Sequence, residues 1–277
     1  MRKLLSANFS RLRKDRIFWS ILLGVLVFSL VTIFNGARSA DVMEKNGFVR
    51  SLDDYYFSQA PYMGMIYAVF ISLFLGTEYS DGTMRNKLII GHTRARVFLA
   101  NFITCFAACL AFAGAWFIGC APGWILIGPF EMGIEGYLTY LLIAVGFTAS
   151  YTAIFTWFCT VCSNKAMTII LTLGAWFGLV LLASALNDRL CVPEMQGGMA
   201  YIDGKFTMLD PAPNPLYLKG MIRTVCECIL DFLPSGQTLL MHDASITHPL
   251  RQIASSVLTT DLLLPAGIIS FRRKDIR

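Results

Sequence analysis

Six long apolar runs restrict this chain more than any other feature of its sequence. A helix needs roughly 20 mostly apolar residues to cross a hydrocarbon core of about 30 Å. The runs are Ile17–Asn35, Pro61–Thr77, Val97–Ile118, Leu138–Thr160, Met167–Leu186 and Gln252–Phe271. The first five contain no Asp, Glu, Lys, Arg or His, whereas the sixth contains Asp261. The sequence therefore predicts an all-α polytopic membrane protein with six transmembrane helices, folded as a single transmembrane domain over residues 1–277.

The composition indicates that lipid is the main solvent of this chain. Only 15% of the 277 residues are charged and 56% are hydrophobic, whereas soluble domains carry about 25% charged residues. A soluble chain of this length would lack the polar surface needed to cover its core. These values exclude a disulfide-rich secreted module, a disordered chain and a nucleic-acid-binding domain. The net charge of +5 comes from short basic clusters beside the apolar runs.

The eight cysteines fit the same interpretation. Four of them fall in or beside apolar runs, where Cys behaves as a small hydrophobe. These four are Cys105, Cys109, Cys159 and Cys162. Cys159 and Cys162 form a C-x-x-C pair, but no second pair and no nearby His accompanies it, so packing is favoured over a metal site. Further along the chain, the sequence leaves open whether Cys191 pairs with Cys226 or with Cys228.

Lysine and arginine predict the orientation of the spans, because cytoplasmic loops of membrane proteins carry an excess of them. Six precede the first run, four lie between the second and third, Lys165 lies between the fourth and fifth, and four follow the sixth. The other side carries eight, spread over much longer segments. Both termini are therefore predicted to be cytoplasmic, which requires an even number of spans.

Residues 1–16 are short, basic and periodic. Apolar residues recur near one helical face, at Met1, Leu5, Phe9 and Leu12. The pattern predicts an interfacial N-terminal helix with its cations among the lipid head groups of the inner leaflet; the alternative is a solvated basic tail. A cleaved signal peptide with a small-residue site before Ala40 is the rival interpretation. It is disfavoured because the apolar run is longer than the usual stretch of about 7–15 residues.

Two segments on the predicted outer side have simple expectations. Gly36–Ala60 is expected to be a plain connector. Val97–Phe130 is too long for one crossing, and Gly119, Pro122 and Gly123 interrupt it. These residues predict an interfacial or re-entrant turn at the outer surface.

The large outer segment, Asn187–Leu250, has a polar, Gly- and Pro-rich first part and a helical second part. In the second part a charged residue recurs every four positions, at Lys219, Arg223, Glu227 and Asp231. Apolar residues fill the other positions up to Pro234, which predicts an amphipathic helix before the last span, lying in the outer leaflet interface. The alternative is a small helix packed on other loops. Arg223 and Glu227 are spaced for an i,i+4 ion pair.

The segment from Glu78 to Arg94, on the predicted cytoplasmic side, is the most specific in the chain. It reads EYSDGTMRNKLIIGHTR and follows the second run without a linker. Ser80 or Asp81 can cap a helix and Gly91 can end it, which predicts a helix of about nine residues. Three consecutive apolar residues near its end would face the cytoplasm. A short, partly apolar helix between two spans suits docking into a groove of a soluble partner.

This segment resembles the coupling region of ABC-2 type permeases, the membrane subunits of one class of ATP-driven transporters. The residues that match the family pattern are Glu78, Gly82, Thr83, Arg85 and Arg94. The basic tail Phe271–Arg277 and the basic amphipathic start resemble the two ends of family members. Asn214–Gln237 is similar to the outer segment of small bacterial members. The resemblance covers all six runs, and Asp261 departs from it because this span is normally apolar in relatives.

The resemblance implies that two permease subunits, identical or sibling chains, associate in the bacterial inner membrane, with two separate ATPase subunits docked beneath them. The ATPase-coupling residues it implies are Glu78, Asp81, Gly82, Thr83, Arg85, Asn86, Lys87, Leu88, Ile89 and Arg94. The chain has no G-x-x-x-x-G-K-[S/T] phosphate loop. ATP and Mg²⁺ are therefore expected on the partner, and this chain is expected to bind no cofactor or metal and to be no enzyme.

Most relatives export, and the apolar surface favours an amphipathic peptide or a lipid-like cargo; similar small members serve in self-protection against peptide antibiotics. The alternative is an ion-coupled secondary transporter that uses Asp261, because buried acids in membranes tend to be functional. We expect Asp261 to be neutral or to face a partner at a helix interface. An enzyme is disfavoured because the three His are not paired at a metal-ligand spacing and no G-x-S-x-G is present. A sensor or scaffold role would leave the coupling segment unexplained.

Overall fold

The computed structural model describes residues 1–46, 51–162, 164–202 and 205–274. Within these residues, six helices are long and apolar enough to cross a membrane. They are α2 (Arg16–Lys45), α4 (Ala60–Ser80), α6 (Arg94–Cys120), α8 (Gly133–Val161), α9 (Lys165–Leu190) and α12 (Pro249–Arg273). Each of them contains one of the six apolar runs, so the prediction of an all-α protein with six spans is confirmed.

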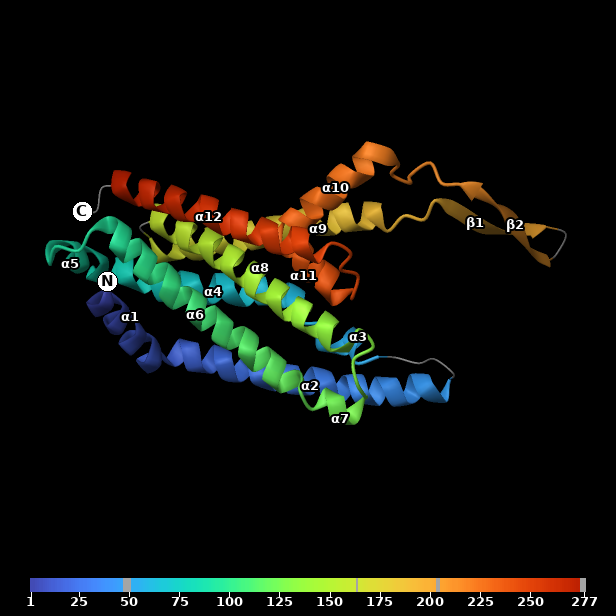
Figure 1. Ribbon diagram of the computed structural model, residues 1–277, viewed down its shortest axis with the longest axis horizontal. Helices are drawn as coiled ribbons and strands as arrows, with labels where there is room; N and C mark the ends of the chain where they lie inside the picture. The colour runs from blue at the N-terminus through green and yellow to red at the C-terminus, as the bar shows by residue number, and fades with distance from the viewer. Residues whose placement is uncertain (47–50, 163, 203–204, 275–277) are drawn as a thin grey trace.

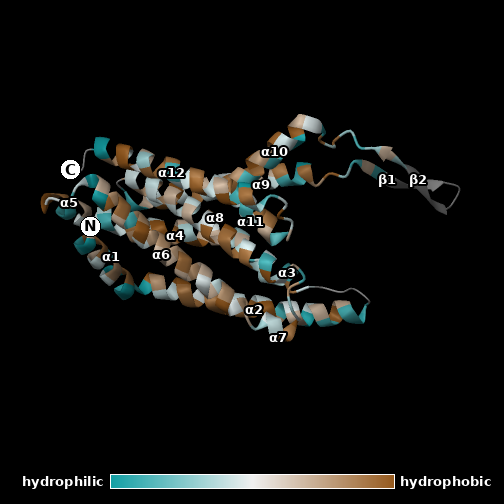
Figure 2. Ribbon diagram, in the orientation of Figure 1, coloured by the Kyte–Doolittle hydropathy of each residue, from teal (hydrophilic) through white to brown (hydrophobic). Residues whose placement is uncertain are grey.

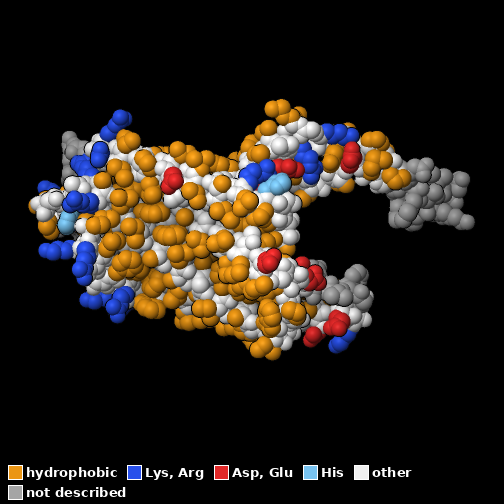
Figure 3. All heavy atoms as spheres, viewed as in Figure 1, with side chains coloured by type: hydrophobic (Ala, Val, Ile, Leu, Met, Phe, Trp, Pro, Cys, Tyr) orange, Lys and Arg blue, Asp and Glu red, His pale blue; other side chains and the backbone are white. Residues whose placement is uncertain are grey.

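The six spans run side by side along the long axis of the molecule (Figure 1). Both chain ends lie at one end of the bundle, beside α1 (Arg2–Lys14) and α5 (Thr83–Ile89). We call this the basic end, because Lys and Arg side chains gather there (Figure 3). Hydrophobic residues predominate along the spans between the two ends (Figure 2), as lipid contact requires.

The opposite end holds the connections from α2 to α4 and from α6 to α8. The expectation of a plain connector after Gly36 is wrong, because α2 continues to Lys45 and α3 (Asp53–Tyr56) follows. Ala, Met, Glu and Lys in this stretch favour helix, and no proline stops it. The predicted break after α6 is confirmed: the chain turns there, and Pro122 is the N-cap of a short helix, α7 (Gly123–Leu126).

A β-hairpin extends away from the bundle at the opposite end (Figure 1). Its strands are β1 (Met195–Ile202) and β2 (Lys205–Pro213), paired antiparallel with a bulge between Gln196 and Gly198. The Gly- and Pro-rich composition gave no expectation of strands. In a two-stranded sheet each strand has an open edge, where proline is tolerated. The prolines of β2 therefore do not prevent the pairing.

α10 (Gly220–Phe232) confirms the predicted amphipathic helix. Arg223 Nε lies 3.0 Å from Glu227 Oε1, which confirms the i,i+4 pair. Several apolar side chains of this helix remain exposed: Met221, Ile222, Val225, Ile229 and Phe232. The helix ends before Pro234, as predicted. An exposed apolar face of this kind is suited to the membrane interface.

α11 (Pro234–His242) turns back onto the bundle. Ser235 Oγ donates a hydrogen bond of 2.8 Å to the carbonyl oxygen of Leu179 in α9, and most of the helix is buried. Three cysteines of the outer segment are free thiols: Cys191, Cys226 and Cys228. The structure therefore contains neither of the two disulfides that the sequence left open.

The core of the bundle is built mainly from aromatic side chains. The largest fully buried ones include Trp116, Tyr67, Tyr151, Phe70, Phe112, Phe147 and Phe155. They belong to α4, α6 and α8, which form the centre of the bundle, whereas α2, α9 and α12 leave most of their surface exposed. The burial of these aromatic side chains holds the three central helices together. The basic-end termini of α4 and α6 flank α5.

Candidate functional site

The segment from Glu78 to Arg94 contains α5, a helix of seven residues between α4 and α6. It begins after Gly82, whose φ of +67° places it in the left-handed region that favours glycine. The expectation that Ser80 or Asp81 caps the helix is wrong. Gly82 is the N-cap, and Ser80 Oγ instead donates to the carbonyl oxygen of Gly76 in α4. Gly91, with φ +95°, follows the helix, and its N–H donates to the Leu88 carbonyl, so the predicted glycine ending is confirmed.

Glu78, in the last turn of α4, is the centre of a buried polar cluster. Its side chain has no exposed surface. Glu78 Oε1 lies 2.5 Å from Arg11 Nη1 and 2.5 Å from Lys87 Nζ. A buried carboxylate is strongly disfavoured unless it is paired and hydrogen-bonded. Here one carboxylate receives two cations, one from α1 and one from α5.

Two asparagines complete this cluster. Asn101 Nδ2 donates to Glu78 Oε2 at 3.3 Å, and Asn8 Nδ2 donates to Asn101 Oδ1 at 2.9 Å. Lys87 Nζ also donates to Asn8 Oδ1 at 2.9 Å. We call Asn8, Arg11, Glu78, Lys87 and Asn101 the Glu78 cluster. Its five members come from α1, α4, α5 and α6, so it joins α5 to three other helices.

The cluster has consequences for Lys87 and for Arg11. Burial lowers the pKa of Lys87, and the Glu78 carboxylate opposes that shift. Arg11 extends beyond Glu78: its Nη2 donates to the carbonyl oxygen of Phe74 at 3.1 Å, and its guanidinium lies 3.7 Å from the centre of the Phe74 ring. Such a cation–π contact adds to the ion pair. Arg11 therefore fixes α1 against the last turns of α4.

Sequence reasoning identified Glu78 and Lys87 but missed the other three members of the cluster. The sequence contained a signal that could have identified Asn101, because it is a polar amide near the start of an otherwise apolar run. Asn8 had a weaker one, since it lies one residue from an apolar position of the N-terminal helix. Arg11 looked like one more interfacial cation. Only the packing of α1 against α4 and α6 separates it from its neighbours.

α5 has an inner and an outer face. Met84 is buried and Leu88 is partly buried against a small core formed by Leu4, Met84, Val97, Phe98, Ala100 and Phe271. Arg85 and Asn86 are exposed, and the side chains of Ile89 and Ile90 are 71% and 76% exposed. We call Arg85, Asn86, Ile89 and Ile90 the α5 surface.

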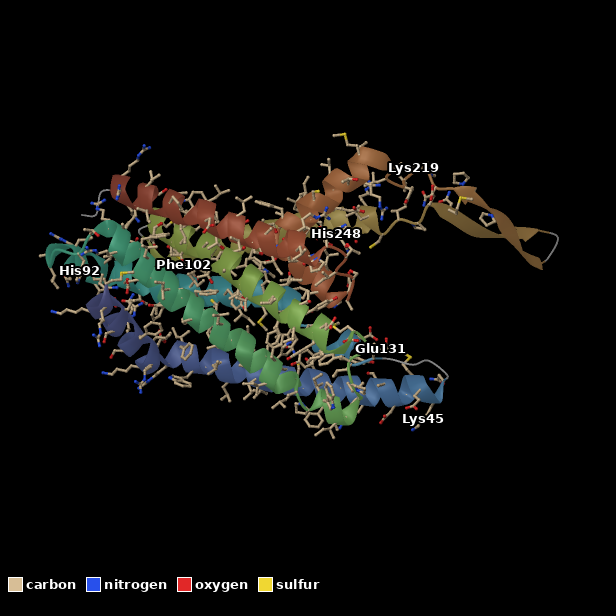
Figure 4. The ribbon with its side chains drawn as sticks, viewed as in Figure 1. Lys45, His92, Phe102, Glu131, Lys219 and His248 are labelled. Atoms are coloured by element: carbon tan, nitrogen blue, oxygen red, sulfur yellow. The ribbon has the colours of Figure 1, made fainter. Side chains whose placement is uncertain are left out.

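The remaining predicted residues border this helix. Asp81 and Thr83 are exposed at its start, and Thr83 Oγ1 donates to the Glu78 carbonyl oxygen at 3.0 Å. The loop that follows α5 carries His92, which lies at the basic end in Figure 4, while Lys45 and Lys219 lie at the opposite end. The α5 surface therefore lies at the same end as both termini.

Arg94 and Lys274 attach the ends of other spans to this region. Arg94 Nη1 donates to the carbonyl oxygens of Phe271, Arg272 and Lys274 at the end of α12. Lys274 Nζ donates to the carbonyl oxygens of Thr160 and Cys162 at the end of α8, at 2.7 Å each. Cations at helix C-termini satisfy carbonyl groups that have no partner within the helix. Burial lowers the pKa of Lys274 to about 8.

Asp261 lies apart from the coupling segment, on the surface of α12. The expectation that it faces a helix interface is wrong within this chain, because its side chain is exposed. It borders an apolar groove of about 360 Å³ between α8 and α12, which Gly146 and Val257 also line. Ser255 and Ser256 occupy the buried side of this helix instead. The ion-coupled alternative therefore has no interior acid on α12.

The family comparison agrees with this geometry. A family model described as "ABC-2 family transporter protein" matches residues 4–178, which is more than half of the chain. The match includes most of α1, the first four spans, α5 and every member of the Glu78 cluster. No curated protein matches the chain at a significant level. The chain therefore belongs to the ABC-2 family of transporter proteins.

Proposed function

We propose that this chain is the permease subunit of an ATP-driven exporter of the bacterial inner membrane, and that its α5 surface docks onto a separate ATPase subunit. Family membership and the six spans support a permease subunit of an ABC transporter. The excess of Lys and Arg at the basic end supports placing that end in the cytoplasm. ATP and Mg²⁺ would then act on the partner, beneath this end.

The observation that carries the proposal is the exposure of Ile89 and Ile90 on a short helix at a polar end of the molecule. α5 lies at the basic end in Figure 1, beside the N-terminus, and both side chains are exposed there. Full burial of one such side chain in a partner's groove contributes about 1.5–3 kcal/mol to the free energy of binding. An apolar pair on a rigid helix is typical of an anchor that fits a groove on a partner. Leu88, which the sequence suggested as a contact, supports the helix from inside.

The Glu78 cluster supplies the mechanical connection. Lys87 on α5 is joined through Glu78 to α4, and Asn8 and Asn101 extend the contacts to α1 and α6. A displacement of α5 by an ATPase would therefore act on several helices together. This is the kind of contiguous, hydrogen-bonded network through which packed elements move as a unit.

The opposite end offers a site for an apolar or amphipathic cargo. A pocket of about 310 Å³ lies between α3, α7 and the start of α8. Its lining is mostly aromatic and aliphatic: Leu52, Tyr56, Trp124, Phe130, Ile134 and Tyr137. Such a lining suits a lipid-like molecule or an amphipathic peptide. A second permease subunit, identical or a sibling, would pack against the exposed apolar surface that the spans leave uncovered.

The test replaces the apolar pair of the α5 surface. Ile89→Asp/Ile90→Asp should insert and fold, because both side chains are exposed, but should release the ATPase that co-purifies with the wild-type chain. The matched control is Met221→Asp/Ile222→Asp, an equally exposed apolar pair on α10. The control should keep the ATPase. Co-purification and ATP hydrolysis by the purified complex are the measurements. If the α5 variant retains its ATPase at the wild-type ratio, the docking assignment is wrong.

A further inference from the structure

α1 has a second face that the Glu78 cluster does not use. Its inner face carries Leu4, Asn8 and Leu12, which are buried, and Arg11, which binds Glu78. A groove of about 620 Å³ runs along the other side of the helix. Its lining consists of Ser6, Phe9, Ser10, Arg13 and Lys14. These positions fall on successive turns of one helical face.

The groove is polar and positively charged. The hydroxyls of Ser6 and Ser10 are exposed, as are Arg13 and Lys14. Within the described residues, neither of these two cations has a carboxylate at ion-pairing distance. The nearest acid in sequence, Asp15, is occupied: its Oδ1 accepts the backbone N–H of Ile17 at 2.8 Å and caps α2. The charge of the groove is therefore available to a ligand.

Trp19 indicates the depth of the groove relative to the membrane. Its indole Nε1 donates to the carbonyl oxygen of Arg13 at 2.9 Å, and its ring is half exposed in the first turn of α2. Tryptophan concentrates at the level of lipid head groups, with its ring among the acyl chains and its N–H toward polar groups. Phe9, partly buried against the main core, forms the apolar floor. The groove thus lies where a phosphate and the start of an acyl chain meet.

We propose that this groove binds the head group of an anionic phospholipid of the inner leaflet. Arg13 and Lys14 bind the phosphate through charge-assisted hydrogen bonds, and Ser6 and Ser10 donate further ones. Phe9 contacts the glycerol and the first methylenes of the acyl chain.

The same helix carries both the lipid groove and two members of the Glu78 cluster. A bound lipid stabilises the placement of α1, and Asn8 and Arg11 on its inner face then hold Lys87 and Glu78. The lipid site therefore adjusts how firmly α5 is held against the spans. The anionic lipid content of the inner leaflet therefore affects how strongly movements of α5 are transmitted to the spans.

The test measures thermal unfolding of the detergent-purified chain, with any subunits that co-purify, in the presence of short-chain lipids. Dioctanoyl phosphatidylglycerol should raise the unfolding temperature, because a ligand that binds only the folded state stabilises it. Dioctanoyl phosphatidylcholine and glycerol 3-phosphate at the same concentration should give little or no shift. An equal shift with phosphatidylcholine would show that the anionic charge is irrelevant. An equal shift with glycerol 3-phosphate would show a site for a free phosphate. Either result overturns the proposal.

Arg13→Gln/Lys14→Gln should unfold at the wild-type temperature without lipid, since both side chains are exposed. It should require about 10- to 30-fold more phosphatidylglycerol for the same shift, because each basic residue near an anionic head group contributes about 1 kcal/mol. Arg272→Gln/Arg273→Gln, an exposed basic pair at the same end, should behave as wild type. Equal loss in both variants would indicate general surface charge and would overturn the site. ATPase co-purification is scored separately, so this outcome is distinguishable from failure of the docking assignment.

Discussion

Glu78 at the basic end and Asp231 at the opposite end are both buried carboxylates, and each is paired with a partly exposed arginine. Arg11 binds Glu78, and Arg251 binds Asp231 through Nε at 2.6 Å. The second carboxylate oxygen of Asp231 accepts from Gln252 Nε2 at 2.7 Å. In both places a charge removed from solvent has its hydrogen-bonding capacity largely satisfied, as burial demands.

The two networks differ in how far their partners lie along the chain. The partners of Asp231 come from α11 and α12: Gln237, Arg251, Gln252 and Ser255. Those of Glu78 are Arg11, Lys87 and Asn101, on α1, α5 and α6, and the first span lies between α1 and Glu78 in the sequence. The first network therefore closes one local unit at the outer side. The second joins α4 to α1, α5 and α6, which is the connection that the proposed transmission from α5 requires.

The largest predicted effect is the loss of stability when the Glu78 carboxylate is replaced. Glu78→Gln leaves the cations of Arg11 and Lys87 beside a neutral amide, and breaking a buried pair in this way costs about 3–5 kcal/mol of the free energy of unfolding. Asp231→Asn should cost less, about 1–3 kcal/mol, because it strands one arginine that is 31% exposed, whereas Glu78→Gln also strands Lys87, which is 16% exposed. Unfolding of both variants in detergent measures the difference. Equal losses would show that the second cation of the Glu78 cluster has no energetic weight.

Two glycines, Gly236 and Gly267, allow the packing of the two regions to be compared. A Cβ at Gly236, inside the α10–α11 unit, would collide with the backbone carbonyl of Leu230, whereas a Cβ at Gly267 would meet the outer edge of the Phe98 ring. A backbone oxygen cannot move away, but a ring can turn. Overpacking of this kind usually costs about 1–3 kcal/mol, so Gly236→Ala should destabilise more than Gly267→Ala. The midpoints of thermal unfolding decide the order, and the reverse order would contradict the rigidity of the outer unit.

The smallest effect is a pH dependence at the basic end. Burial lowers the pKa of Lys274 to about 8 in the folded chain, while an unfolded lysine keeps its proton up to about pH 10.4. Between these values the unfolded state binds more protons, so the free energy of unfolding rises with pH. The unfolding temperature of the wild type should therefore rise relative to Lys274→Arg, which stays charged. A constant or falling difference from pH 8 to pH 10 would refute the burial of this charge.

The six spans, the cluster of cations at one end and the breaks at Pro122 and Pro234 could all be predicted from the sequence. These features are local, because the length of an apolar run, a proline and a cluster of cations act on their own stretch of chain. The position of the coupling helix between two spans was equally readable. Its start was not: the side chains of Ser80 and Asp81 are ordinary caps, yet Gly82 begins the helix.

Which polar residues contact one another depends on how the helices pack, and the sequence did not predict it. Nothing local distinguishes Arg11 from Arg13, but the packing of α1 against α4 and α6 turns Arg11 toward Glu78 and leaves Arg13 on the exposed groove of α1. Packing also decides which residues of α5 are buried: Leu88 packs against the small core that contains Phe98, whereas Ile89 and Ile90 remain exposed. On α12, Ser255 and Ser256 are buried against α11 and α8, and Asp261 remains exposed. A helix of given sequence has a fixed pattern of faces, and its neighbours decide which face is buried.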